Sequence, residues 1–338
     1  MTQRRLTERQ RERIQRLQEQ RRERAGRRLD ALDRAGLGPE QMGLIIAHHG
    51  QTSIVETDDR RLYRCVARQN LGRLACGDRV IWQASGAEEG VIVALGERRS
   101  LLARPDAGGQ ARPVAANLDA VVVVLAPEPT HSEDLIDRYL VAIAAIGVPG
   151  LLVLNKLDLL DAAALAVLHQ QLEPYRRIGY PLLLTSSHTA HGLDELRAGL
   201  RDRVSLLVGQ SGVGKSSLIK ALLPDREIRI QALSALTGQG VHTTTTSMLY
   251  HLPDGGDLID TPGVRGFELG EISLDDLDRG FPDLAPYLGR CRFSDCRHEV
   301  EPGCAVRVAA AHGAIAPRRL GSYRRLRAAL QAAPRGWN

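Results

Sequence analysis

The sequence predicts a multidomain fold in which a small β-barrel is followed by a parallel α/β domain and by a mostly helical C-terminal domain. Between Gly43 and Leu102 apolar residues recur with a period of two, which is typical of short strands. Residues 119–260 alternate strand and helix patterns around a GxxxxGKS loop, which favours a parallel sheet. Three cysteines and one histidine then fall within residues 291–304, a density typical of a small metal-stabilised domain.

The composition indicates an ordinary globular protein. Of 338 residues 43% are apolar, which is enough for the cores of two or three domains. No apolar stretch is long enough to span a membrane, and the start of the chain is charged throughout, unlike a signal peptide. Five cysteines without an export signal favour a reducing compartment. We therefore expect a cytoplasmic protein with no membrane partner.

Positive charge is concentrated at the two ends of the chain. Residues 1–34 carry twelve Arg against six acidic residues, and residues 305–338 carry seven Arg and no acidic residue, although the net charge is only +5. Such basic ends favour binding to a polyanion, and a solvated charged helix is the alternative for either end. Residues 1–36 are expected to form a basic helical arm, because their apolar positions are sparse.

The first folded domain is expected over residues 37–104. Turn signals separate five short strand patterns there, so a small five-stranded barrel is predicted. The patterns cover residues 44–48, 53–57, 62–67, 79–83 and 90–95. An OB-fold fits this count and length, and periodicity alone leaves other small barrels open. Cys65 and Cys76 lie here without metal-ligand spacing, so we expect them in the core or in turns.

A phosphate-binding loop is predicted between an apolar strand pattern at 204–208 and a helix that begins at Lys215. Its glycines let backbone N–H groups converge on phosphate oxygens, and the helix N-terminus faces the anion. Lys215 would reach the β- and γ-phosphates, and the Ser216 hydroxyl would bind Mg²⁺. A glycine-rich turn is the alternative. The predicted nucleotide ligands in this loop are Gly209, Gln210, Ser211, Gly212, Val213, Gly214, Lys215, Ser216 and Ser217.

A second motif, NKLD, follows the apolar strand pattern at 151–154 and predicts which base is bound. The Asp158 carboxylate can accept hydrogen bonds from N1–H and the exocyclic amine of guanine, whereas adenine offers no such pair of donors. Asn155 would address the base and brace neighbouring loops, and the stem of Lys156 would lie along the ring. An exposed carboxylate at a helix N-terminus is the alternative. Asp158 argues against an ATPase or a kinase.

The order of the motifs is unusual. An ordinary GTPase has the phosphate loop first, followed by the switch threonines, DxxG, NKxD and a serine-containing guanine loop. Here NKLD and the guanine loop with Ser186 and Ser187 come before the phosphate loop, whereas a threonine run at 243–246 and DTPG at 260–263 come after it. Only the starting point has moved, so a circularly permuted GTPase domain is predicted. Its former ends would join near residues 199–203.

With this motif order the chain resembles the RsgA family, also called YjeQ, of circularly permuted GTPases that depend on the small ribosomal subunit. The resemblance covers about residues 40–320 and rests on the motif order, the HTTT run at 242–245 and the spacing of the C-terminal cysteines. It implies an OB-fold for the barrel. It also implies docking on the small subunit and its rRNA in late maturation, with GTP hydrolysis that is faster on the subunit.

The C-terminal cysteines form the pattern CxxxxCxH, followed by five residues and a further Cys. Three thiolates and one imidazole can close a tetrahedral zinc site, although the single residue between Cys296 and His298 is tighter than generic finger spacing. Three buried cysteines in a helical tail are the alternative. The resemblance implies that the pattern binds one structural zinc per chain. The predicted ligands are Cys291, Cys296, His298 and Cys304.

The remaining predicted ligands surround the γ-phosphate and Mg²⁺. Asp260 would hold Mg²⁺ through water, and the Gly263 N–H would meet the γ-phosphate. One of Thr243 to Thr245 would complete the metal shell. The sequence does not decide which threonine of the run binds Mg²⁺, and we assign this role to Thr244.

The residue that orients the attacking water is the last predicted element of the site. Val264 occupies the position after DxxG where many GTPases place Gln, and it can neither donate nor accept, so we expect slow intrinsic turnover. His242, directly before the threonines, is the nearest polar candidate, with a pKa close to working pH. The resemblance implies a catalytic role for this histidine. The alternative is that His242 only packs its segment.

These motifs predict a GTP hydrolase with an OB-fold over residues 37–104, a permuted GTPase domain over 105–268 and a zinc-binding helical domain over 269–338. Its expected ligands are GTP and GDP with Mg²⁺, and its expected partners are the small ribosomal subunit and rRNA. We expect a monomer. The alternative function is a nucleotide-gated RNA-binding scaffold whose hydrolysis is incidental.

Overall fold

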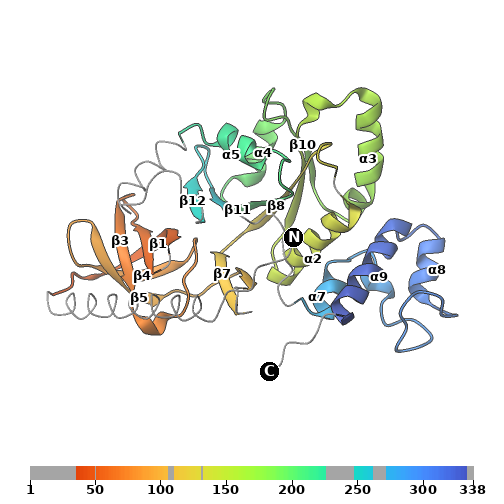
Figure 1. Cartoon of the computed structure of the whole chain (residues 1–338), viewed down its shortest axis with the longest axis horizontal. Helices are drawn as coiled ribbons and strands as arrows, with labels where there is room; N and C mark the ends of the chain where they lie inside the picture. The colour runs from red at the N-terminus through yellow and green to blue at the C-terminus, as the bar shows by residue number, and fades with distance from the viewer. Residues whose placement is uncertain are drawn as a thin grey trace, which may run out of the picture.

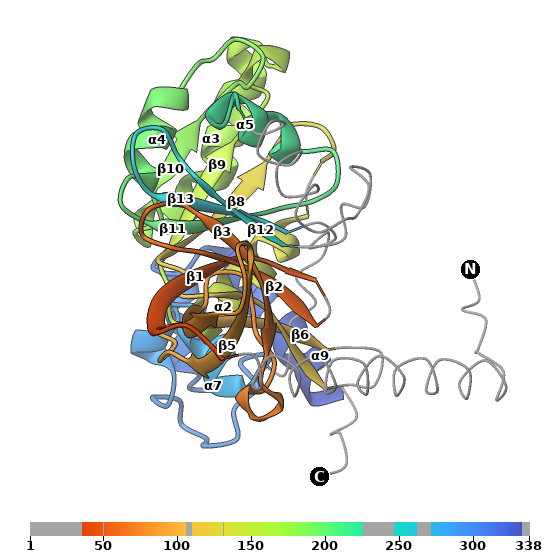
Figure 2. The same ribbon diagram turned by 90° about the vertical axis from the view of Figure 1, so that its left-hand side faces the viewer.

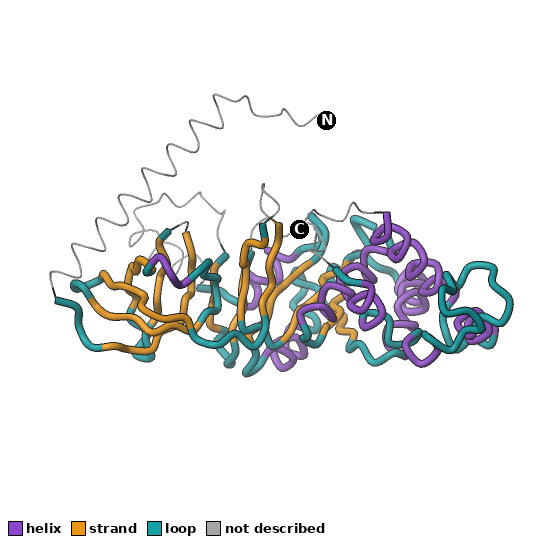
Figure 3. Tube along the Cα trace, turned by 90° about the horizontal axis from the view of Figure 1, so that it is seen from below, coloured by secondary structure: helices purple, strands orange, loops and turns teal. Residues whose placement is uncertain are grey.

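The computed structural model describes residues 36–49, 51–105, 110–130, 132–225, 247–261 and 272–332. Figure 1 shows an elongated arrangement, with a barrel at one end, an α/β domain in the middle and the C-terminal helices at the other end. Figure 3 shows strands concentrated at one end and helices at the other. None of the described helices is both long and apolar enough to span a membrane. Nearly all of the predicted N-terminal arm lies outside the described residues.

The N-terminal domain is a closed barrel of five strands, as predicted. They are hydrogen-bonded in the order β1-β2-β3-β5-β4, and β4 returns to β1. The strands are β1 (Glu40–His49), β2 (Thr52–Glu56), β3 (Leu62–Ala67), β4 (Arg79–Ala84) and β5 (Glu89–Leu95). Trp82 is fully buried inside, and Gly43 and Gly90 make room for it, because a Cβ there would lie 2.9 and 2.6 Å from its ring. Cys65 and Cys76 are buried, as expected.

A hairpin that no sequence pattern revealed follows the barrel. Its strands β6 (Leu101–Pro105) and β7 (Ala111–Ala116) form a separate two-stranded sheet. The hairpin spans residue 104, where we expected the first domain to end. Cys76 of the barrel forms an isolated bridge with Ala115 of β7. The hairpin therefore lies at the junction of the barrel and the α/β domain (Figure 1).

The α/β domain is built on parallel strands in the order β10-β9-β8-β11-β13, with β12 antiparallel beside β13. The strands are β8 (Ala120–Leu125), β9 (Gly150–Leu154), β10 (Leu182–Leu184), β11 (Val204–Val208), β12 (Met248–His251) and β13 (Asp257–Asp260). The phosphate-loop strand β11 lies between β8, which precedes it in sequence, and β13, which follows it. One sheet thus contains strands from both sides of the phosphate loop, as the circular permutation predicted.

Helices cover both faces of this sheet. The helices are α2 (Glu133–Ile146), α3 (Ala162–Arg177), α4 (Leu193–Leu200) and α5 (Lys215–Leu222). Val121 and Val123 of β8 share an apolar cluster with α2 and α3, whereas Val122 and Val124 share one with α4 and α5. Because successive side chains point to opposite faces, burial on both faces explains why β8 is apolar throughout. Residues 201–203 connect α4 directly to β11, near the predicted junction of the former ends.

The barrel and the α/β domain share one continuous sheet of eleven strands. The connection is made by β1 and β12, where Ala47 pairs with Met248. Figure 2 shows β12 beside the barrel strands. The edge of the α/β sheet is therefore covered by the barrel.

The C-terminal domain packs on α2 of the α/β domain. It contains α7 (Leu274–Arg279), α8 (Ala305–Ala311) and α9 (Pro317–Ala332). Arg319 of α9 is fully buried, and its guanidinium group lies 2.5 Å from Asp137 of α2 and 2.7 Å from Asp283. The same group lies 4.1 Å from the centroid of the Phe281 ring. A charge can be buried here because two carboxylates and an aromatic face surround it.

The C-terminal arginines are used inside the fold. Arg325 pairs with Asp134 of α2 at 2.6 Å, and Arg324 and Arg327 each donate to a backbone carbonyl of the loop between α7 and α8. The charge of residues 305–338 favours binding to a polyanion or a solvated charged helix; several of these arginines also have partners within the protein, and binding to a polyanion stays a prediction. These guanidinium groups bind the domain to itself and to α2.

Candidate nucleotide and metal sites

The predicted phosphate loop connects the end of β11 to the start of α5. Gly209, Gly212 and Gly214 have φ angles of 147°, 87° and 93°, a backbone region that glycine adopts with least strain. A Cβ at Gly209 would lie 2.4 Å from the carbonyl oxygen of Val124 in β8. The Lys215 ammonium group donates to the carbonyls of Gly209 and Gln210 at 2.6 and 2.7 Å. The lysine thus lies over a loop shaped to receive phosphate oxygens.

Asn155 joins the phosphate loop to the predicted base-recognition loops. It is buried after β9, and its Nδ2 donates to the Val213 carbonyl at 3.0 Å. Its Oδ1 accepts from the Thr185 hydroxyl at 3.3 Å and from the Ser187 backbone N–H at 3.2 Å. A Cβ at Gly214 would lie 2.3 Å from Nδ2, so only glycine fits beside it. These contacts fit the bracing role predicted for this side chain.

The exposed Asp158 carboxylate is oriented by Ser186. The Ser186 hydroxyl donates to Asp158 Oδ1 at 2.5 Å, and its oxygen accepts from the backbone N–H groups of His188 and Thr189 at 3.3 and 3.1 Å. The hydrogen bond from Ser186 is the largest of the effects that lower the pKa of Asp158. A fixed, charged acceptor is the group that guanine recognition requires.

The other predicted ligands lie at the carboxyl ends of the parallel strands, as the phosphate loop does. Lys156 has a φ of 62° and donates to the Glu128 carbonyl at 2.9 Å, between β8 and α2. Ser216 and Ser217 are exposed in the first turn of α5. Asp260 ends β13, next to the phosphate-loop strand. The sheet thus brings residues from all of these described motifs together at the carboxyl ends of its parallel strands.

Two buried polar atoms lie near the carboxyl ends of these strands. Thr261 directly follows Asp260, and Gln210 belongs to the phosphate loop. Within the described ranges, Thr261 Oγ1 and Gln210 Oε1 have no hydrogen-bond partner. Because a buried polar atom without a partner is costly, both fit a site that a bound nucleotide with its Mg²⁺ completes.

The predicted catalytic histidine and several switch residues lie outside the described residues. They are His242, Thr243, Thr244, Gly263 and Val264. Their roles stay predictions.

The four predicted metal ligands come together in the C-terminal domain. Their ligand atoms, from Cys291, Cys296, His298 and Cys304, all lie within 4.8 Å of one another. Cys291 Sγ is 3.8 Å from Cys304 Sγ, and His298 Nδ1 is 3.5 and 3.4 Å from these two sulfurs. Metal–sulfur bonds of about 2.3 Å at tetrahedral angles put two sulfurs about 3.8 Å apart. The donors are therefore spaced to hold a tetrahedral metal ion.

The start of α8 supports this cluster. Cys304 is the N-cap of α8, and its sulfur accepts from the Arg307 N–H at 3.4 Å. Burial raises the pKa of Cys291, but the backbone N–H groups of Val306 and Ala305 outweigh it, so the pKa is lowered. Donors at a helix N-terminus thus favour the thiolate, the form that binds metal.

Residues that no motif marked hold the metal loop in place. Arg327 donates to the Cys296 carbonyl at 2.9 Å, and Arg324 donates to the His298 carbonyl. These contacts join α9 to the loop across about thirty residues of sequence, a separation that no spacing rule covers.

Glu301 shapes the same loop. Its carboxylate accepts from the backbone N–H groups of Arg297 and Glu299, both at 2.8 Å. Hydrogen bonds from its own backbone N–H and from that of Arg297 are the main causes that lower the pKa of Glu301 to about 2. The carboxylate therefore stays charged at neutral pH and ties the loop between His298 and Cys304.

Comparison with known proteins identifies relatives along the whole chain. The family model described as RsgA GTPase matches residues 95–270. A protein from Pseudomonas aeruginosa (strain LESB58) named small ribosomal subunit biogenesis GTPase RsgA is 49% identical over 334 residues, which covers 98% of each chain. A protein of the same name from Azotobacter vinelandii is 50% identical over 338 residues, with the same coverage.

Solved structures share the architecture. YjeQ from Thermotoga maritima matches with a TM-score of 0.71 and 31% identity, over 87% of this chain and 99% of its own. YloQ, described as a circularly permuted GTPase, matches with a TM-score of 0.69 and 29% identity, over 88% and 98%. Similarity of this extent, in sequence and in structure, means that the chain belongs to the RsgA GTPase family.

Proposed function

We propose that this GTPase binds the small ribosomal subunit and its rRNA in late maturation and hydrolyses GTP faster when it is bound there. The observation that carries the nucleotide part is the position of Asn155, which ties the phosphate loop at Val213 to the loop of Ser186 and Ser187. The ribosomal part is supported by the relatives, whose names place them in small-subunit biogenesis.

Base selection rests on Asp158 in this proposal. Its carboxylate, oriented by Ser186, accepts from N1–H and the exocyclic amine of guanine. Each bond to a charged acceptor contributes about 1.5–3 kcal/mol. Adenine cannot make this pair of bonds. The stem of Lys156 packs along the base. Ser187 lies beside the base site, because its backbone N–H donates to Asn155.

The phosphates lie in the loop between β11 and α5. Backbone N–H groups of this loop and the Lys215 ammonium group bind their oxygens. Ser216, Thr244 and Asp260 would hold Mg²⁺, the last through water, and the bound ion would supply neutralisation of charge on the β- and γ-phosphates. The Gly263 N–H meets the γ-phosphate.

His242 orients the attacking water in place of the glutamine that Val264 replaces. A neutral imidazole can accept a proton from water, and the ordinary pKa of a histidine, about 6.5, is close to neutral pH. Subunit docking brings His242 to the water and so accelerates hydrolysis without an external arginine.

The Cys₃His cluster holds one zinc ion with a structural role. This donor set closes a tetrahedral site and leaves no open position for chemistry, which is typical of structural zinc. We further propose that the protein acts as a monomer in the cytoplasm, where it meets small subunits during assembly.

Competition binding tests the nucleotide assignment. Unlabelled GTP and GDP should displace a fluorescent guanine nucleotide, whereas ATP at the same concentrations should not, because Asp158 pairs only with guanine. Equal displacement by ATP would contradict the assignment and favour an ATPase. Lys215→Ala is the control for specific binding, since it removes the phosphate contact and leaves the base pocket intact.

A further inference from the structure

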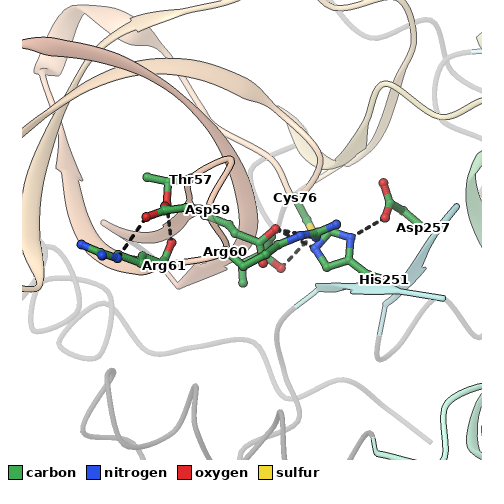
Figure 4. A network of polar contacts seen from close by, with 9 residues as sticks. Thr57, Asp59, Arg60, Arg61, Cys76, His251 and Asp257 are labelled. Carbon is green, nitrogen blue, oxygen red and sulfur yellow. Dashed lines mark hydrogen bonds and ion pairs between the residues drawn. The ribbon is translucent and has the colours of Figure 1, made fainter. Parts of the chain in front are cut away.

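His251, at the end of β12, lies between two carboxylates from distant parts of the chain. Its Nε2 is 2.7 Å from Glu56 Oε1 at the end of the barrel strand β2, and its Nδ1 is 2.6 Å from Asp257 Oδ1 at the start of β13. Figure 4 shows the ring close to Asp257 and reached by groups from the barrel. The side chains of His251 and Glu56 are only 18% and 11% exposed, so solvent screens this contact weakly.

The geometry favours the charged form of the ring. Both nitrogens lie at hydrogen-bond distance from carboxylate oxygens, and only the imidazolium can donate from both. Burial lowers the pKa of His251, but the hydrogen bonds to Asp257 and Glu56 outweigh it, so the pKa is raised. A raised folded-state pKa means that the contribution of the bridge is complete below the unfolded value of about 6.5. It is lost as the pH rises through the folded-state pKa.

Two neighbouring groups lie close to this contact: Arg60 shares the Glu56 carboxylate with His251, and Cys76 is neutral. Burial raises the pKa of Glu56, but the hydrogen bonds and positive charges of His251 and Arg60 outweigh burial, so the pKa is lowered. Arg60 donates to Glu56 at 2.9 Å. Cys76 lies near the ring in Figure 4, and burial together with the charges of Asp78 and Asp257 raises its pKa, so the thiol is neutral. The imidazolium thus faces two carboxylates, beside one exposed guanidinium group and a neutral thiol.

The hairpin of β12 and β13 carries this bridge at one end and Asp260 at the other. His251 pairs with Asp257 across the hairpin, and Met248 pairs with Asp260. Met248 also pairs with Ala47 of β1, a single registered backbone pair within the described residues. Leu249 and Ile259 of the hairpin also pack in one apolar cluster with Ile54 and other barrel residues. Apolar packing has no preferred direction, so the polar contact at His251 adds a directional link between the barrel and the far end of the hairpin. The two ends of the hairpin are about 10 Å apart, so a tilt at one end moves the other.

We propose that His251 is a positioning residue for GTP hydrolysis, bridged to Glu56 so that it sets the direction of the β12–β13 hairpin relative to the barrel and places Asp260 beside Mg²⁺. The inference rests on the proposed function, because Asp260 acts only with a bound nucleotide. A partner that displaces the barrel then changes the position of Asp260 through Glu56.

NMR titration of the histidines in the full chain tests the bridge, with His251→Gln identifying the His251 signal. Glu56→Gln keeps the side-chain shape but removes the charge, and should lower the pKa of His251 by about one pH unit. Asp59→Asn is the matched control, because it removes a carboxylate from the same turn that contacts Thr57 and Arg61 (Figure 4). The control should leave the His251 pKa in place. An unchanged pKa in Glu56→Gln would overturn the bridge.

Steady-state hydrolysis tests the positioning role. At pH 6.5 Glu56→Gln and His251→Gln should each lower kcat about threefold to tenfold, with the KM for GTP nearly unchanged, because the base and phosphate contacts remain. The double variant should lose no more than either single variant. The ratio of wild-type kcat to His251→Gln kcat should approach one as the pH rises through the His251 pKa. Effects of other titrating groups cancel in this ratio.

The outcomes separate the inference from the function on which it rests. Wild-type kcat in both single variants would reduce the bridge to a structural contact and overturn the inference, even if the His251 pKa responds to Glu56→Gln. A wild-type chain that does not hydrolyse GTP at all would overturn the proposed function instead.

Discussion

Recognition of guanine depends on how firmly single side chains are held. Asp158 is exposed, so the protein fixes its direction through the Ser186 hydroxyl, which is itself held by two backbone N–H groups. Asn155 fixes the adjoining backbone from the other side. The carboxylate that we propose to bind the base is thus oriented without a nucleotide, which would lower the entropic cost of binding.

Replacement of the carboxylate tests this arrangement. Asp158→Asn should weaken GTP binding by about two to three decades, because two charge-assisted hydrogen bonds are lost. Xanthosine triphosphate, whose base presents an acceptor to the new amide, should regain affinity. Ser186→Ala keeps the carboxylate but frees its direction, and should cost about tenfold. Fluorescence titration measures all three, and an unchanged GTP affinity in Asp158→Asn would refute the assignment.

Site residues could be predicted where the residues that share one function lie close together in the sequence. The phosphate loop, NKLD and the cysteine pattern each place several ligands within fifteen residues, so spacing alone indicated them. The contact of Glu56 with His251 joins residues 195 positions apart. No periodicity or motif indicates such a contact, because the barrel and the hairpin meet only in the folded chain.

At the scale of elements, the metal loop, residues 291–304, has few buried side chains apart from the metal ligands themselves. It is held by the Cys₃His cluster, the Glu301 carboxylate and the arginines of α9. A metal ion in the cluster therefore contributes directly to the folding of this region.

Loss of one ligand should be felt locally. Cys296→Ser should release zinc and unfold the metal loop and α8, while GTP binding stays within about threefold, because the nucleotide site lies on another domain. Elemental analysis, circular dichroism and nucleotide titration check this together. A preparation without metal that is fully folded would rule out a structural role. Arg292→Gln, in the same loop but outside the ligand set, is the control.

The packing of α9 on α2 gives a second element-scale test. Arg319→Met should lower the free energy of unfolding by about 3–5 kcal/mol, because Asp137 and Asp283 stay buried without their partner. Arg325 also lies on α9, and its exposed ion pair with Asp134 of α2 is broken in Arg325→Gln. This change should lower the free energy of unfolding by only about 0–1 kcal/mol. Denaturant unfolding compares the two. Equal, small effects would mean that the buried charge does not hold the interface.

Elements with strong periodicity were predicted closely, and others were missed for physical reasons. Strand β8 is buried on both faces and β3 lies between clear turns, so both stood out. The hairpin of β6 and β7 has Pro113 in its second strand, which argues against a strand from sequence alone. The arginines of α9 resembled a solvated basic segment, because their carboxylate partners lie on other elements.

At the scale of the whole molecule, the nucleotide site lies in the middle domain, and each outer domain is joined to a different part of it. The barrel contacts the β12–β13 hairpin through Met248 and His251, and the helical domain contacts α2 through Arg319. In the sequence, the DTPG motif at 260–263 comes directly before the C-terminal domain. Loss of the γ-phosphate can therefore act on surfaces at both ends, as a nucleotide switch on a large partner requires.

GTP turnover with and without purified small ribosomal subunits, at saturating GTP, is the most direct test of this account. The wild type should turn over slowly alone and faster by about 10² or more with subunits, the scale of a positioned general base. His242→Ala should still bind GTP and subunits but lose most of this stimulation. Equal wild-type rates with and without subunits would contradict the account and favour an RNA-binding scaffold whose hydrolysis is incidental.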